Sequence, residues 1–498
     1  MTKKIYIHEL ECYKQATEEK RRKLRISEEK YFDLEGLPSG QIREILETFV
    51  WERGKALAPS SLASELLYYN NIRNFLIEKN IKELHYDKQE KLLRLLRGWM
   101  MEHGYALTSR KYKPEYDVVA NETSGIEKHM KKLLRFIKPE DNRDEQEKDV
   151  WELNKFEFEI RDNPIINTKT INFTNIRQED MRTEMKRAIY LQLKYMSLSY
   201  ILAEISAMNR FSEYLARKHP EILSLQDLER KQIEEYLIYL QTEDKRRKDY
   251  RSELYSLKNV ISEVGKIYEQ KHIGTLFINT DFPSSPRYVF KYRTDAEIKR
   301  LNSYIFKMDE QISRCLIIHQ MLGARISETL TLKVDCLTFR NEHYFVRIDT
   351  IKSTTYEKPV SEELAELIRA AISYTQEHYG ETTYIFVNAD DPTRPYQYAM
   401  IQKRIMVMIR QNDIRDDHGE LMQFGTHIYR HSYGKKLTEM HVEDWMIARL
   451  FGHKTLRTVH HYRQIGNKMM ADETRKAREK MDSILLQIIE GWEGYEIR

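Results

Sequence analysis

The chain has 498 residues, more than one ordinary domain holds, so we expect two to four domains. Hydrophobic residues make up 41% of it, enough for real cores, and glycine (17) and proline (11) are scarce, which disfavours turn-rich all-β architectures. Lysine and arginine (82) nearly balance aspartate and glutamate (78), so the local distribution of charge is more informative than the net charge.

Cysteines and apolar runs exclude several classes of protein. Cys12, Cys315 and Cys336 form no CxxC pair and are too few for a disulfide framework or a cysteine zinc site. The first residues contain no apolar core segment, and no run approaches ~18 apolar residues. We therefore expect a cytoplasmic protein without a secretory signal, a membrane span or a bound metal.

The N-terminal third alternates between polar and helical patterns. Residues 1–29 are highly charged and are expected to be weakly structured. Residues 30–140 carry apolar side chains at helical spacing, as in SSLASELLYYNNIRNFLIEK, and predict a helical N-terminal domain whose role the sequence leaves open. Residues 141–176 mix strand-like pieces with turns, a pattern that fits either a linker or an extension of the next domain.

The middle of the chain predicts a second helical domain. Four amphipathic patterns with short connections lie between residues 177 and 272, so residues 177–280 are expected to form a compact all-α domain. Residues 281–295, DFPSSPRYVFKYRTD, hold two prolines and two serines and are typical of an interdomain linker.

Residues 296–480 predict a domain of mixed α+β structure. Alternation in residues 344–349 and a turn-prone Ser353-Thr354-Thr355 predict a small antiparallel sheet, and TTYIFVN is a further short strand candidate. Helical patterns surround these strands. The tail, residues 481–498, is an amphipathic helix that could pack on a neighbouring subunit or on its own domain.

Positive charge is concentrated near the C-terminus. Between residues 424 and 468 the chain has eight lysines and arginines against three acidic residues, and six of its 16 histidines. Such a segment fits a site that handles phosphate, although a solvated helical surface explains the composition alone equally well.

Six residues stand in an order that is far more specific than any one of them. They are Arg325 in HQMLGARISETL, Lys352 in IDTIKSTTYEKPV, His427 and Arg430 in GTHIYRHSYGKKL, and His453 and Tyr462 in RLFGHKTLRTVHHYRQI. This set resembles the catalytic set of the tyrosine recombinase (phage integrase) family, which runs Arg, Lys, His-x-x-Arg, His, Tyr. Tyr462 follows His453 by nine positions, the family's usual interval.

Two positions depart from the family's pattern, and one assignment has a competitor. Thr426 stands where members often carry Asp, and Phe451 where Leu is commoner; neither supplies a reacting group. Lys358 competes with Lys352 for the role of catalytic lysine, because the loop between them varies in length across the family. Residues 150–215 further resemble proteins of transposons that move by tyrosine recombination.

The resemblance implies a mainly α, multidomain fold. An all-α core-binding (SAM-like) domain would precede a mixed α+β catalytic domain with a small antiparallel sheet. It also implies a site-specific DNA recombinase that cuts and rejoins strands through a 3′-phosphotyrosyl intermediate, in integration, excision or transposition of a mobile element. A type IB topoisomerase-like enzyme and a catalytically silent DNA-binding relative are the alternatives.

The resemblance also assigns roles to the residues. Tyr462 would be the nucleophile, and Arg325 and Arg430 would grip the phosphate oxygens. The remaining roles are a hydrogen bond to phosphate from His453, a base (His427), an acid (Lys352) and support of the site (Glu328). No metal or cofactor is required.

The partners implied are double-stranded DNA, a homotetramer on paired sites and accessory recombinases. Five basic residues between two helices of the 177–280 domain are candidates for phosphate contacts, although a solvated loop also explains them. They are Lys245, Arg246, Arg247, Lys248 and Arg251.

Overall fold

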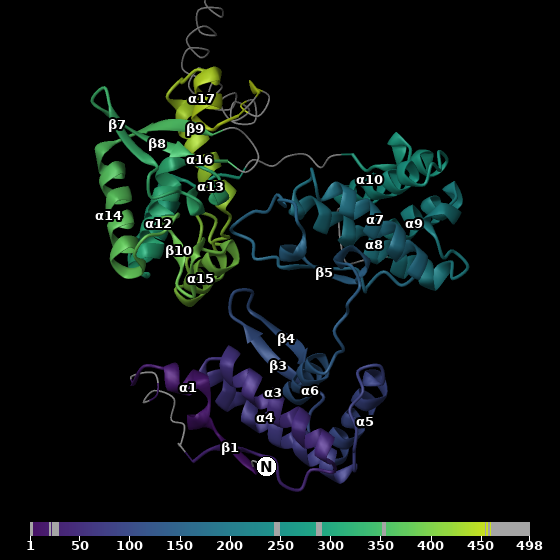
Figure 1. Cartoon of the computed structure of the whole chain (residues 1–498). Helices are drawn as coiled ribbons and strands as arrows, with labels where there is room; N and C mark the ends of the chain where they lie inside the picture. The colour runs from purple at the N-terminus through teal and green to yellow at the C-terminus, as the bar shows by residue number, and fades with distance from the viewer. Residues whose placement is uncertain are drawn as a thin grey trace, which may run out of the picture. The chain divides into compact units, whose positions relative to one another are not determined.

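A computed structural model of the chain describes residues 3–18, 21, 29–243, 250–284, 291–350, 355–453, 455–456 and 459. The chain divides into two compact units, Met1–Asn142 and Arg143–Arg498. Helices dominate both units, and the described sheets are antiparallel and have two or three strands (Figure 1). The predicted fold class, mainly helical with small antiparallel sheets, is confirmed. None of the described helices combines the length and the apolar character that a membrane span needs.

The first unit consists of helices and two small ribbons. Its longer helices are α3 (Gly40–Ala56), α4 (Pro59–Glu78), α5 (Gln89–Glu102) and α6 (Gly125–Phe136). The shorter ones are η1 (Ile7–Glu9) and α1 (Glu11–Gln15). Strand β1 (Lys4–Tyr6) pairs with β2 (Tyr31–Asp33), and β3 (Thr108–Lys113) pairs with β4 (Val118–Thr123). The ribbons are additions to the helical pattern that the sequence predicts.

The start of the chain differs from the weak structure expected of it. Ile5, Ile7 and Leu10 are fully buried and belong to the same core as the longer helices. Pairing of β1 with β2 explains the difference, because a strand directs alternate side chains to one face and needs few apolar residues to be anchored. The high charge of residues 1–29 concealed this short alternation.

The four predicted helices of the middle region are present as α7 (Glu179–Gln192), α8 (Leu198–Lys218), α9 (Arg230–Thr242) and α10 (Arg251–Ile267). They share one apolar core. Trp151, Ile171 and Phe173 are fully buried in that core, because β5 (Val150–Glu152) pairs with β6 (Thr170–Asn172). The 3-10 turns are η2 (Glu145–Glu147), η3 (Leu153–Lys155), η4 (Leu225–Asp227), η5 (Ile273–Thr275) and η6 (Asn279–Asp281).

Most buried apolar residues from residue 291 onward form one core, which Ile165 also joins, and a small cluster around Ile447 and Phe451 lies apart from it. The helices of this part of the chain are α11 (Asp295–Ile305), α12 (Glu310–Leu322), α13 (Ile326–Leu330), α14 (Glu362–Tyr379), α15 (Tyr398–Gln411), α16 (Thr426–Glu439) and α17 (Asp444–Leu450). Strands β7 (Leu337–Arg340), β8 (His343–Ile348) and β9 (Tyr356–Val360) form an antiparallel sheet in that order, as predicted, and β10 (Val387–Asn388) pairs with β11 (Asp391–Pro395).

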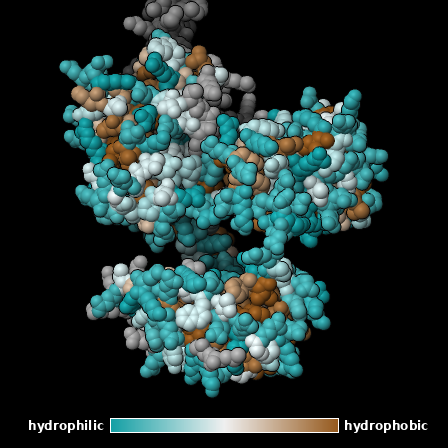
Figure 2. Space-filling model, in the orientation of Figure 1, coloured by the Kyte–Doolittle hydropathy of each residue, from teal (hydrophilic) through white to brown (hydrophobic). Residues whose placement is uncertain are grey.

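The surface follows the composition. On the face shown in Figure 2, hydrophilic residues predominate and apolar side chains gather only in small patches. This agrees with a chain in which 32% of the residues are charged.

Candidate phosphate-binding site

The first arginine of the ordered set lies in the turn between α12 and α13. α12 is followed by its C-cap Gly323, which adopts the left-handed conformation (φ +57°) that commonly terminates helices. Arg325 is the N-cap of α13, and its backbone N–H donates to Glu328 Oε2 at 2.7 Å. Nη1 of Arg325 lies 2.5 Å from Oε1 of the same carboxylate. Glu328 therefore fixes both the backbone and the guanidinium of Arg325.

The second arginine, Arg430, lies on α16 and is only 3% exposed. Its Nη1 donates to the backbone oxygen of Gly323 at 3.2 Å, and its Nη2 to that of Phe451 at 2.7 Å. Nη1 is also 3.7 Å from Oε2 of Glu328. One buried carboxylate thus lies between the two guanidinium groups, which brings residues 325 and 430 together.

His453 completes this cluster from the turn after α17. Its Nε2 lies 2.9 Å from Nη2 of Arg430. A guanidinium can only donate, so Nε2 is the acceptor and the ring proton is on Nδ1. Burial, with the nearby charges of Arg430 and Arg325, lowers the pKa of His453 to about 4. The imidazole is therefore neutral near pH 7 and offers Nδ1–H as a donor.

Strand β9 contributes two more side chains to this cluster: Tyr356, which the motif did not include, and Lys358, which was the competitor of Lys352. The hydroxyl of Tyr356 donates to Glu328 Oε2 at 3.3 Å, and burial raises the pKa of Tyr356, so it keeps its proton. Lys358 is 2% exposed; its Nζ donates to the backbone oxygen of Leu322 and lies 3.9 Å from the centre of the Tyr433 ring. Strand alternation was the available signal, because positions 356 and 358 share a face.

The buried lysine is electrostatically unusual. Burial, followed by the charge of Arg430, lowers the pKa of Lys358 to about 7. Arg325, Arg430 and Lys358 face a single described carboxylate, that of Glu328. An excess of cations in a largely buried place is suited to an anion with more than one negative oxygen, such as a phosphate.

The other predicted residues fall into two groups. His427 is exposed on α16, three positions before Arg430, and its ring centre lies 6.3 Å from that of His431. Arg251 begins α10; its guanidinium donates to the backbone oxygen of Pro283 and lies over the ring of Tyr255. Outside the described residues lie Tyr462, Lys352, Lys245, Arg246, Arg247 and Lys248. Their assignments stay predictions.

Comparisons with known proteins identify a matching family model and several relatives. Residues 291–468 match the family model described as the phage integrase family. Transposase B from transposon Tn554 of Staphylococcus aureus strain Mu50 is 24% identical over 400 residues, which are 79% of this chain and 63% of that protein. The chain therefore spans less than two thirds of the length of this relative. Tyrosine recombinase XerA of Thermococcus kodakarensis is 26% identical over 198 residues, 40% of this chain and 65% of that protein.

Among solved structures, the post-cleavage complex of XerH site-specific recombinase with a palindromic difH substrate aligns with a TM-score of 0.46. The identity is 15%, over 61% of this chain and 90% of that one.

Proposed function

Because the chain belongs to the phage integrase family, which comprises the tyrosine recombinases, we propose that it is a site-specific DNA recombinase acting through Tyr462. It would cut and rejoin DNA strands through a covalent 3′-phosphotyrosyl link. The observation that carries this proposal is the gathering of Arg325 and Arg430 around Glu328, with His453 against Arg430. Segments more than a hundred residues apart in sequence meet there, and their clustered cations are suited to a phosphate.

The reaction needs stabilisation of charge on the scissile phosphate. Attack by the Tyr462 oxygen places negative charge on the non-bridging oxygens, and guanidinium groups can hold these in bidentate fashion. Arg325, whose side chain is 29% exposed, is the more accessible of the two. The neutral ring of His453 adds a hydrogen bond from Nδ1.

Two proton transfers complete the chemistry. Tyr462 must lose a proton whose ordinary pKa is about 10, and His427 is the proposed base. The leaving 5′ oxygen gains a proton, and Lys352 is the proposed acid. Lys358 fits this second role less well, because its Nζ is buried and bound to the backbone oxygen of Leu322.

The substrate is proposed to be double-stranded DNA at the ends of a mobile element. The names of the relatives, a transposase and a recombinase, support this class of substrate. A homotetramer on paired sites, assisted by accessory recombinases and located in the cytoplasm, is the assembly that the family resemblance implies. The helical domain with α7–α10 would bind DNA through Lys245, Arg246, Arg247, Lys248 and Arg251.

A nicked duplex tests this proposal. Duplexes made from the DNA at each end of the mobile element carry a nick just past the scissile phosphate, so that cleavage releases a short strand and traps the covalent adduct. We expect a 3′ adduct with the native protein and none with Tyr462→Phe. Persistence of the adduct in Tyr462→Phe would rule out this nucleophile.

Strand exchange separates recombination from its nearest alternative. The native protein should join two different DNA molecules that carry the site. Relaxation of supercoils without joining would indicate a topoisomerase. DNA binding without an adduct would indicate a silent relative.

A further inference from the structure

The segment from residue 291 to 295, the end of the predicted interdomain linker, lies along α16. The backbone oxygen of Lys291 is 2.9 Å from Nδ1 of His431, and the ring of Tyr292 lies 4.9 Å from the ammonium of Lys435. The backbone N–H of Arg293 donates to Ser432 Oγ at 2.8 Å. Asp295 also forms an ion pair with Lys436 at 2.6 Å, so four residues of this segment contact α16.

These contacts use one side of the helix. At 3.6 residues per turn, positions 431, 432, 435 and 436 lie within about 140° of one another around the helix axis. Positions 427, 430 and 434 share the adjacent face, which carries the proposed base and the buried arginine. The segment that leads into this domain and the phosphate-binding side chains are therefore held by neighbouring faces of the same rigid element.

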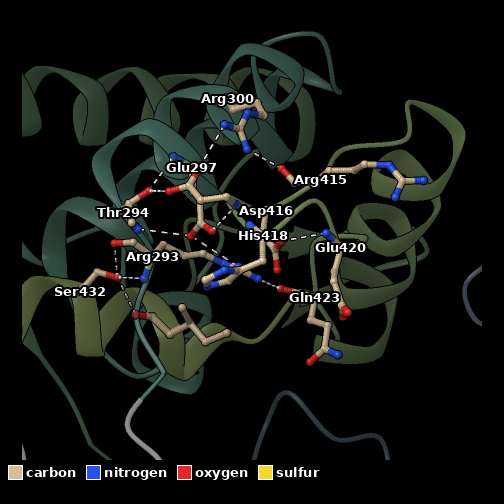
Figure 3. Close-up of polar contacts among 12 residues, drawn as sticks. Arg293, Thr294, Glu297, Arg300, Arg415, Asp416, His418, Glu420, Gln423 and Ser432 are labelled. Atoms are coloured by element: carbon tan, nitrogen blue, oxygen red, sulfur yellow. Dashed lines mark hydrogen bonds and ion pairs between the residues drawn. The ribbon is translucent and has the colours of Figure 1, made fainter.

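Ser432 is the most buried member of the contact face, with 4% of its surface exposed. It accepts from the Arg293 backbone and donates to the backbone oxygen of Ile428 at 3.0 Å. The guanidinium of Arg293 continues the attachment to the backbone oxygen of Gln423, just before α16, as Figure 3 shows. Arg293 is thus tied both to the segment just before α16 and to the second turn of that helix.

The far side of the segment is also anchored. Thr294 caps α11, and its hydroxyl donates to Asp417 Oδ2 at 2.6 Å. Oε1 of Glu297 accepts the backbone N–H of Asp417 at 3.0 Å. The segment is therefore held in place by α11 and the 416–423 loop. Because it is held on this side, it can fix the position of α16 on the other.

We propose that the segment from residue 291 to 295 places α16, and that Ser432 is a positioning residue for Arg430 and His427. This rests on the proposed function. A shift of α16 by about 1 Å would misalign both side chains with the scissile phosphate, and such a shift costs up to ~10²-fold in rate. We expect the rate of the chemical step to fall, and not the affinity for DNA, because Ser432 lies on the face of α16 that contacts the segment.

Three variants test this with the full-length protein and the nicked duplex described above. Ser432→Ala removes the hydroxyl; Ser432→Thr retains it. Arg300→Ala is the matched control, because Arg300 joins α11 to the neighbouring segment, at the Arg415 oxygen (Figure 3) and at Asp417 Oδ1 (3.2 Å). Among the described residues, Arg300 makes no hydrogen bond to α16. Adduct formation at saturating DNA, the dissociation constant for the duplex and the melting temperature are measured for each.

We expect Ser432→Ala to slow adduct formation at least ~10-fold, with the dissociation constant changed less than ~2-fold. Ser432→Thr should restore the rate, and Arg300→Ala should leave it near native. If Ser432→Ala does not fold, His431→Leu, which removes the bond to Lys291, takes its place with the same expectation.

Three results would overturn the inference: a native rate in Ser432→Ala, an equal loss in Arg300→Ala, or a loss that lies in DNA binding alone. Failure of the native protein to form any adduct would instead contradict the proposed function.

Discussion

Oε1 of Glu328 lies 2.5 Å from Nη1 of Arg325, and the carboxylate is 3% exposed. Breaking a buried ion pair by removing one charge typically costs about 3 kcal/mol. We therefore expect Glu328→Gln to lower the free energy of unfolding by about that amount and to slow adduct formation at least ~10-fold, because Arg325 loses its anchor. Urea unfolding and the nicked duplex measure the two effects.

A second buried ion pair provides the control for this variant. Glu253, on α10 of the helical domain, is 6% exposed and lies 2.5 Å from Nη2 of Arg210. Glu253→Gln should reduce stability comparably but leave adduct formation at saturating DNA near native. Equal loss of cleavage in both variants would mean that Glu328 acts only through stability.

Changing the charge of the scissile phosphate provides a test of the role of Arg325. Arg325→Ala should slow cleavage of ordinary DNA by ~10²–10³-fold, as loss of one donor to a developing oxyanion does. A methylphosphonate at the scissile position replaces one charged oxygen by a methyl group. On that substrate the ratio of native to variant rates should shrink to ~10 or less, because less charge needs stabilisation. An unchanged ratio would assign Arg325 a structural role.

The choice between Lys352 and Lys358 depends on the leaving group. A duplex in which sulfur replaces the leaving 5′ oxygen needs no proton from an acid, because a thiolate leaves readily. Lys352→Ala should therefore be slow on ordinary DNA and near native on the thio-substituted duplex. Lys358→Met should be slow on both, since the buried lysine touches the Leu322 backbone. Rescue of Lys358→Met alone would reverse the assignment.

The ordered motif named three described residues that lie together, but it did not indicate how they are held. Arg325, Arg430 and His453 come together because each motif includes its own turn or cap. The burial of Lys358 was not predicted, because composition marks a lysine as exposed. Its inward direction depends on the pairing of Val346 with Lys358, which the sequence does not specify.

Lys358 also makes stability depend on pH. Burial and Arg430 lower its pKa from 10.5 to about 7, so between these values the unfolded chain binds more protons than the folded one. Stability contributed by this group therefore rises with pH over that window. Lys358→Met removes the buried charge, so we expect its melting temperature to exceed the native value near pH 6 and the difference to shrink towards pH 10. A difference in melting temperature that stays the same at all pH values would contradict the low pKa of Lys358.

The conformation of Gly452 is required for the placement of His453. Gly452 has φ +61°, and an added Cβ would lie 2.6 Å from the Tyr356 ring. Gly452→Ala should lower the free energy of unfolding by about 2 kcal/mol, from backbone strain and overpacking together, and should slow adduct formation. Gly104 has φ +72° with nothing within 4 Å of an added Cβ, so Gly104→Ala isolates the backbone contribution. The free energy of unfolding of both variants is measured with urea. Equal decreases would show that the Tyr356 ring moves aside for the added methyl group without destabilising the protein.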